Sequence, residues 1–210
     1  VQSLGHLPIN IGKNLNFVDF MSFSAHKFHG PRGVGILYSK SGASILSLQP
    51  LLHGGGQERN VRPGTENVEQ IVITTRVLEF ILNDQLSQRC QYMEKLRAVV
   101  LLGLEPFCKT GLVRITGHPT DRLCHHISFC VRDTQKEQII RELGDKGICI
   151  SGSSACSTQN TVASHVLTAI RVPVEYLYGA IRISLSIRNS LADVTRIRKE
   201  LTKILQSKTT

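Results

Sequence analysis

The 210-residue chain has no tryptophan and few other aromatic residues, with seven phenylalanines and four tyrosines. It also has no apolar run that approaches the roughly 18 consecutive residues that a membrane helix needs. Its first residues, VQSLGHLPIN, lack the basic stretch and apolar core of a secretion signal. These absences predict a protein that is neither exported nor anchored in a membrane, and we expect a cytoplasmic location.

The charge of the chain is positive, but it is not concentrated. Lysine and arginine number 25 and aspartate and glutamate 16, which gives a formal net charge of +9 at pH 7. A nucleic-acid interface would gather basic residues and provide aromatic rings for base stacking. The dispersed charge and the shortage of rings therefore argue against nucleic-acid binding. A basic surface suits an anionic cofactor or an acidic protein partner equally well.

The cysteines show no CxxC pair, so neither a zinc site nor a thioredoxin-like motif is predicted. The six are Cys90, Cys108, Cys124, Cys130, Cys149 and Cys156. An even number could form disulfides, but a chain of this length without a secretion signal is expected to keep its thiols reduced. Cys149 lies in an apolar run and Cys130 follows a phenylalanine, so both are interpreted as core thiols.

The first part of the chain alternates apolar runs with loops. Residues 17–24 and 34–38 are predicted to be buried strands, separated by a turn rich in glycine and proline. Residues 51–67 combine glycines, a proline and charged side chains, which predicts a loop suited to function. Helical spacing then extends from Val68 to Leu104, with a break expected near residues 83–85.

The second part of the chain reads as a separate α+β unit. Strands are predicted at residues 112–116, 125–131 and 148–151, with a helix around residues 137–143. A last helix is predicted after Ser190, which forms a capping box with Asp193. Its apolar stripe consists of Leu191, Val194, Ile197, Leu201 and Ile204. We place the boundary near residue 81, which gives domains of residues 1–81 and 82–210.

The segment SFSAHKFHGPRGVG, residues 22–35, places Lys27 directly after a strand and between two histidines. A lysine held at a strand end can form a Schiff base if its surroundings keep a fraction of it neutral. A solvated lysine in a turn is the alternative that these residues leave open.

This segment resembles the cofactor-lysine motif of the NifS-like cysteine desulfurases, a group within the class V aminotransferases. The motif is Ser-x-His-Lys-x-x-Gly-Pro-x-Gly-x-Gly, and every fixed position matches. The resemblance implies an α/β fold of the pyridoxal-phosphate (PLP) transferases of fold type I. Residues 1–81 would be the C-terminal part of the large cofactor-binding domain and residues 82–210 a small α+β domain. It also implies that Lys27 is the PLP-binding lysine, that Ser24 and His26 bind the phosphate, and that Gln2 contacts the pyridoxal ring oxygen.

Three further segments carry the same resemblance. GGGQERNVRPGTEN, residues 54–67, is similar to a family loop whose threonine, here Thr65, contacts the cofactor of the other subunit in a homodimer. SGSSACST, residues 151–158, is similar to the loop that carries the sulfur-accepting cysteine, here Cys156. AIRIS, residues 180–184, is similar to the strand whose arginine, here Arg182, holds the substrate carboxylate, a bidentate task that suits guanidinium. A structural ion pair is the alternative for Arg182.

The sequence departs from the family at two places. The family's Ser-Leu-Gly-Arg appears here as Ser-Leu-Ser-Ile, residues 184–187, and its Arg-Leu-Pro appears as Arg122, Leu123 and Cys124. In addition, the family's aspartate for the pyridinium nitrogen and its ring-stacking histidine are not among these 210 residues. Part of the cofactor cradle is therefore expected to come from elsewhere.

The resemblance as a whole implies a PLP-dependent cysteine desulfurase. Such an enzyme converts L-cysteine to L-alanine and forms a persulfide, here on Cys156, for a sulfur acceptor such as an iron–sulfur scaffold protein. Two alternatives stay open. One is a selenocysteine lyase, which shares much of the GGGQERN loop, and the other is an inactive remnant that serves only as an interaction domain.

Overall fold

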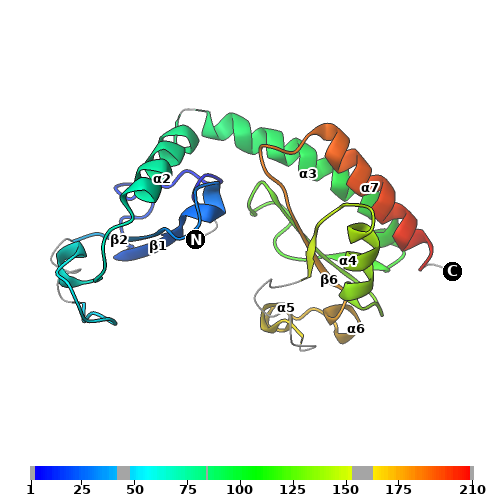
Figure 1. Cartoon of the computed structure of the whole chain (residues 1–210). Helices are drawn as coiled ribbons and strands as arrows, with labels where there is room; N and C mark the ends of the chain where they lie inside the picture. Colours follow the sequence, from blue (N-terminus) through cyan, green and yellow to red (C-terminus); the bar gives the residue numbers. More distant parts are fainter. Residues whose placement is uncertain (1–2, 42–47, 84, 153–162, 209–210) are drawn as a thin grey trace. The chain divides into compact units, whose positions relative to one another are not determined.

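The computed structural model describes residues 3–41, 48–83, 85–152 and 163–208 (Figure 1). The chain divides into two compact units, Val1–Ser87 and Gln88–Thr210. The predicted boundary at residue 81 coincides with the last residue of helix α2, which spans Val68–Ile81. Over the described residues, no helix is both long and apolar enough to cross a membrane.

The first unit is built on a two-stranded antiparallel sheet. Strands β1 (Phe20–Ser24) and β2 (Gly35–Ser39) pair along their whole length and are connected through the 3-10 helix η1 (Ala25–Phe28). A second 3-10 helix, η2 (Glu58–Asn60), lies in the loop before α2. The small core of this unit consists of Leu4, Ala25, Phe28 and Ile81.

The prediction that both strands are buried is wrong. Each strand alternates exposed and half-buried residues, and Phe20 and Leu37 are 40% and 48% exposed. Phe23 and Ile36 pack against the small core, whereas Leu37 faces the other side of the sheet. Successive side chains of a strand point to opposite faces, and the described residues cover only one of them.

The second unit contains an antiparallel sheet of four strands in the order β3-β4-β6-β5. The strands are β3 (Val113–Ile115), β4 (His126–Val131), β5 (Ser151–Gly152) and β6 (Ala180–Ser184). The helices are α3 (Leu86–Lys109), α4 (Lys136–Gly144), α5 (His165–Ala169), α6 (Val174–Leu177) and α7 (Leu191–Gln206).

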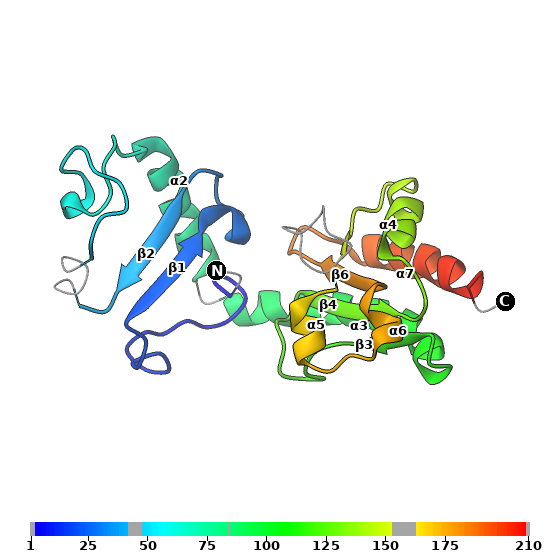
Figure 2. The same ribbon diagram turned by 90° about the horizontal axis from the view of Figure 1, so that it is seen from below.

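The two faces of this sheet are covered by different helices. Figure 1 shows α3 and α7 together on one side, and Figure 2 shows α5 and α6 in front of the other. The larger core lies under α3, α4 and α7, and its buried residues include Leu96, Val100, Leu104, Ile127, Phe129, Ile139, Leu143, Ile181, Val194, Leu201 and Leu205. A smaller cluster under α5 and α6 contains Cys130, Leu167, Val172, Tyr176 and Ala180.

Helix boundaries follow local signals in the sequence. The helical region breaks between Ile81 and Leu86, as its pattern predicts. The capping box of α7 is confirmed, because Ser190 Oγ accepts from the Asp193 amide at 3.2 Å and Asp193 Oδ2 accepts from the Ser190 amide at 2.8 Å. Of the predicted apolar stripe, Leu191 is the exception, since it is 60% exposed at the first turn.

The strand predicted at residues 148–151 is mostly absent. The Ile148 amide donates to the Leu143 carbonyl at 2.9 Å, and Gly147 has a φ of 70°. This left-handed (αL) turn terminates the helix, so residues 147–148 close the C-terminal end of α4, where a strand was expected to begin. Cys149 is consequently exposed, and its interpretation as a core thiol is wrong, whereas Cys130 is fully buried.

Candidate functional site

Lys27 lies on a turn that is anchored in the core of the first unit. Ala25 and Phe28, three residues apart on η1, are 0% and 1% exposed, and both pack with Leu4 and Ile81. Lys27 lies between these anchors and is exposed. The backbone of the lysine is therefore held on both sides while its side chain faces outward.

Two glycines allow this turn to close. The Gly30 amide donates to the Ala25 carbonyl at 2.9 Å, and the Ala25 amide donates to the Val34 carbonyl at 3.0 Å. A Cβ at Gly30 would lie 2.9 Å from both the Cβ and the carbonyl oxygen of Ala25, which is closer than real contacts allow. Gly33 has a φ of 88°, a conformation that favours glycine.

The polar groups beside Lys27 have no partners within the part of the chain that the structure describes. Ser24 occupies the N-cap position of η1, but its hydroxyl caps no backbone amide. His26 is exposed, and none of the described carboxylates forms an ion pair with Lys27. A hydroxyl, an imidazole and an ammonium group thus project from one short turn. Such a set suits an anion that also carries a carbonyl group.

The loop that carries Thr65 is closed by its own side chains. Gln57 Oε1 accepts from the Gly64 amide at 3.1 Å, and Pro63 is buried. Between these points η2 contains three consecutive left-handed residues, with φ values of 48°, 59° and 65° at residues 58–60. Such a run is costly for residues other than glycine and persists only when its surroundings fix it. Thr65 comes directly after Gly64 and is exposed.

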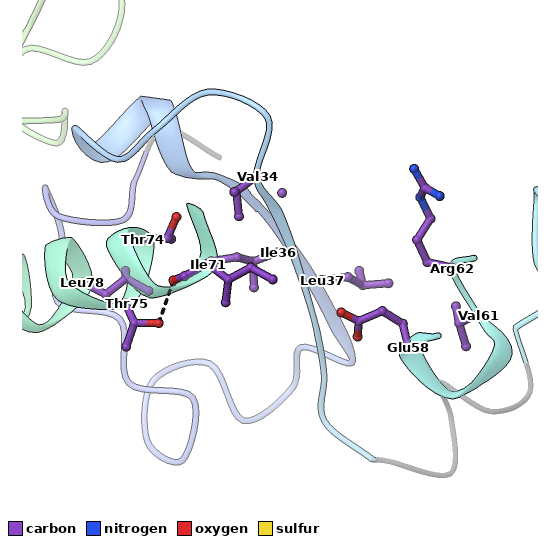
Figure 3. A pocket seen from close by; sticks show the side chains of 11 residues that line it. Val34, Ile36, Leu37, Glu58, Val61, Arg62, Ile71, Thr74, Thr75 and Leu78 are labelled. Atoms are coloured by element: carbon purple, nitrogen blue, oxygen red, sulfur yellow. Dashed lines mark hydrogen bonds between the residues drawn. The ribbon is translucent and has the colours of Figure 1, made fainter. Parts of the chain in front are cut away.

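A cavity of about 450 Å³ lies in the same unit, between β2, α2 and residues 58–62. Figure 3 shows Val34, Ile36, Ile71 and Leu78 along one part of its lining, with Glu58, Val61 and Arg62 on another. Ser24, His26, Lys27 and Thr65, the described side chains predicted to bind the cofactor, do not line it. The cavity is therefore distinct from the described part of the predicted cofactor site.

Arg182 lies on the face of the four-stranded sheet that is opposite the larger core. Its neighbours on β6, Ile181 and Ile183, point into that core, so Arg182 points away from it. Its cross-strand partners are Ser128 on β4 and Ser151 on β5. The Nε atom of Arg182 is buried, and no described group accepts a hydrogen bond from it.

The electrostatics around Arg182 favour an anion. The pKa of the nearby His126 imidazole is lowered, mainly by burial and then by Arg122, Arg182 and Arg97. No ion pair of Arg182 with an acidic residue occurs within the described ranges, so its alternative interpretation as a structural ion pair gains no support. A buried guanidinium donor without an acceptor can bind a carboxylate.

The predicted site residues fall into three groups. Ser24, His26, Lys27 and Thr65 belong to the first unit, and the first three lie within four consecutive residues at the end of β1 and in η1. Arg182 belongs to the second unit. Gln2 and Cys156 lie outside the described residues, although the segment that carries Cys156, residues 151–158, begins with β5, the strand that pairs with Arg182.

Two features of the Arg182 surroundings were missed by sequence reasoning. His126 and Ser128 alternate with the buried Ile127 and Phe129, so the period of two in HHISFCV already indicates that they share a face. No pattern in the sequence indicates that Ser151 lies beside Arg182, because the pairing of β5 with β6 depends on the order of the strands in the sheet.

Comparison with known proteins places this geometry in a family. Residues 1–197 match the family described as Aminotransferase class-V. The chain is 40% identical over 206 residues to "Cysteine desulfurase IscS" of Methanosarcina thermophila. This alignment covers 98% of the chain and 49% of that protein. The chain is 35% identical over 206 residues to "Cysteine desulfurase IscS" of Dictyoglomus turgidum, and this alignment covers 98% of the chain and 50% of that protein.

Solved structures agree with these relatives. A NifS-like protein superimposes with a TM-score of 0.81 at 36% identity, over 98% of this chain and 50% of that one. A NifS-like protein from Rickettsia africae superimposes with a TM-score of 0.82 at 29% identity, over 98% of this chain and 52% of that one. The chain thus spans about half the length of the relatives that it matches.

Proposed function

Because the chain belongs to the aminotransferase class-V family, we propose that it carries the cofactor lysine, the sulfur acceptor and the carboxylate clamp of a PLP-dependent cysteine desulfurase. The observation that carries the proposal is Lys27 itself, an exposed lysine without an ion pair among the described residues, on a turn fixed by Ala25 and Phe28. The names of the relatives support the choice of reaction.

The residues around Lys27 fit this cofactor. PLP joins a carbonyl group to a phosphate dianion and, when bound, acts as an electron sink for bonds broken at the substrate α-carbon. Lys27 would hold the carbonyl carbon, and the Ser24 hydroxyl and His26 ring would donate to the phosphate. Gln2 would contact the ring oxygen. Thr65 would reach the phosphate of a second copy's cofactor, so the proposal includes a homodimer.

In the reaction, three side chains of this chain have separate tasks. Arg182 binds the carboxylate of L-cysteine through its planar guanidinium and fixes the orientation of the substrate. Lys27 moves the α-proton as a general base and later returns a proton. Cys156, as a thiolate, attacks the substrate sulfur, and the electron pair of the broken carbon–sulfur bond remains on carbon. Protonation of that carbon gives L-alanine, and a persulfide stays on Cys156.

The persulfide must then leave the protein. We propose a sulfur acceptor, such as an iron–sulfur scaffold protein, and a cytoplasmic setting, since such acceptors require reduced thiols. The position of Cys156 in a segment rich in small residues, SGSSACST, supports transfer to a second protein.

An assay of L-cysteine turnover tests the proposal. The protein supplied with PLP is expected to release L-alanine and to acquire one additional sulfur, located by peptide mass on Cys156. Cys156→Ser should abolish the added sulfur, and Cys149→Ser, a change at an exposed cysteine, should not. Turnover of selenocysteine without turnover of cysteine would identify a selenocysteine lyase instead. Loss of both activities in a folded, PLP-loaded protein would contradict an enzymatic role.

A further inference from the structure

Two cysteines outside the proposed active site lie against each other in the second unit. Cys90, Glu94 and Arg97 occupy one side of α3, at the i, i+4 and i+7 positions, and this side faces the segment before β4. Arg97 donates to the Leu123 carbonyl at 2.9 Å. One residue further on, the thiol of Cys124 is hydrogen-bonded to the thiol of Cys90.

The two thiols differ in their access to solvent. Cys124 is 3% exposed, whereas Cys90 is half-buried. Burial raises the pKa of Cys124 to about 12, with the hydrogen bond to Cys90 and the charge of Glu94 acting in the same direction. A small oxidant therefore meets Cys90 first, and Cys124 is placed behind it as the second thiol.

We propose that Cys90 and Cys124 form a reversible disulfide, which makes this pair a redox-sensitive modification site. The proposal stands on the contact between the thiols and on the fixed approach of α3 to residues 123–124. It is independent of the cofactor and of the proposed reaction. Cys124 also occupies the position of the proline in the Arg-Leu-Pro pattern that Arg122 and Leu123 otherwise follow, so the pair is a feature of this chain and not of that pattern.

The oxidant is a low-molecular-weight disulfide, and the exchange balances in two steps. The Cys90 thiolate attacks one sulfur of that disulfide, forms a mixed disulfide and releases one small thiolate, which takes up a proton. The Cys124 thiol then loses its proton to solvent as its sulfur attacks Cys90 Sγ, and the second small thiol leaves. Two protein thiols are oxidised by two electrons, and one small disulfide is reduced to two thiols.

The disulfide would join α3 to the segment that leads into β4, the strand that borders Arg182. Cys90 lies near the start of α3, and Cys124 lies two residues before β4, which carries Ser128 opposite Arg182. The closed loop runs from residue 90 to residue 124 and includes all of β3. Cross-linking a loop of this length reduces the entropy of the unfolded chain, so the oxidised unit should resist unfolding.

Peptide mapping after mild oxidation tests the proposal. The protein is treated with oxidised glutathione, quenched with an alkylating agent, digested and analysed by mass spectrometry. The expected result is a cross-linked peptide pair that contains Cys90 and Cys124, lighter than the two reduced peptides by two hydrogen atoms and lost on treatment with dithiothreitol. The thermal midpoint should rise by about 5–10 °C in the oxidised protein.

Matched variants separate this pair from general thiol oxidation. Cys90→Ser should abolish both the cross-link and the rise in midpoint, whereas Cys149→Ser, at an exposed cysteine, should leave both unchanged. Recovery of Cys90 and Cys124 as alkylated peptides or separate glutathione adducts, under conditions that fully modify Cys149, would overturn the proposal. So would a cross-link distributed among several cysteine pairs.

Discussion

The side chains around Arg182 combine burial with charge of one sign. Arg122, Arg182 and Arg97 all lower the pKa of His126 after the larger effect of burial. Arg122 itself donates to the Thr116 carbonyl at 2.7 Å, and the Thr116 and Ser128 hydroxyls are 2.6 Å apart. The Arg122 guanidinium is thus held by a neutral acceptor, and none of the described carboxylates forms an ion pair with Arg122 or Arg182.

Removal of one guanidinium should change the titration of His126. We predict that Arg182→Ala raises the pKa of His126, because the imidazolium then meets less repulsion. Titration of the imidazole resonances by NMR measures this shift, with Arg171→Ala as a control at an exposed arginine. An unchanged His126 pKa in the Arg182→Ala protein would show that the two groups do not interact.

The same imidazole links stability to pH. The folded-state pKa of His126 lies below the ordinary value near 6.5, so the unfolded chain binds its proton first as pH falls. The contribution of His126 to the free energy of unfolding is therefore most favourable above about pH 6.5 and is lost as pH falls toward the lowered pKa. Denaturant unfolding at several pH values across the NMR titration range should show that the free energy of unfolding falls as the pH is lowered.

Sequence reasoning at the residue scale succeeds where a motif is local. Lys27, Ser24 and His26 lie within four consecutive residues, and their common turn follows from the glycines around them. The two serines beside Arg182 were not predicted, because cross-strand neighbours come from segments more than 20 residues apart. The exposure of Cys149 was also missed, since the apolar letters around it do not show where α4 ends.

At the scale of elements, the turn that carries Lys27 depends on a close backbone approach. We predict that Gly30→Ala destabilises the first unit by about 1–3 kcal/mol, because the new Cβ would meet the Ala25 carbonyl oxygen and Cβ. Denaturant unfolding measures the change. Gly144→Ala, at the end of α4, is the matched control, because a Cβ there meets nothing within 4 Å. Equal stability of the two variants would rule out the proposed constraint.

Elements with strong local signals were predictable, and those shaped by distant contacts were not. The capping box of α7 and the break after α2 follow from side chains within a few residues of each boundary. The exposure of β1 and β2 was mispredicted because an apolar run does not tell how many neighbours a sheet has. The strand at residues 148–151 failed because the closure of α4 at Gly147 and Ile148 outweighed β propensity.

At the scale of the whole molecule, the chain matches about half the length of its relatives. Among the described residues, the buried core of the first unit contains four residues, while the larger core belongs to the unit Gln88–Thr210. The residues proposed for the site are divided in the same way, with Lys27 in the first unit and Arg182 in the second. The enzymatic activity therefore stays a proposal, but the role of Lys27 is testable on this chain.

Chemical trapping of the cofactor tests the central claim most directly. The native protein is incubated with a limiting amount of PLP, reduced with borohydride, digested and mapped by mass spectrometry. We predict that the cofactor is attached mainly to Lys27, and that Lys27→Arg loses this label while Lys40→Arg, a change at another exposed lysine, keeps it. Equal labelling of the exposed lysines, or full labelling of the Lys27→Arg protein, would contradict the account.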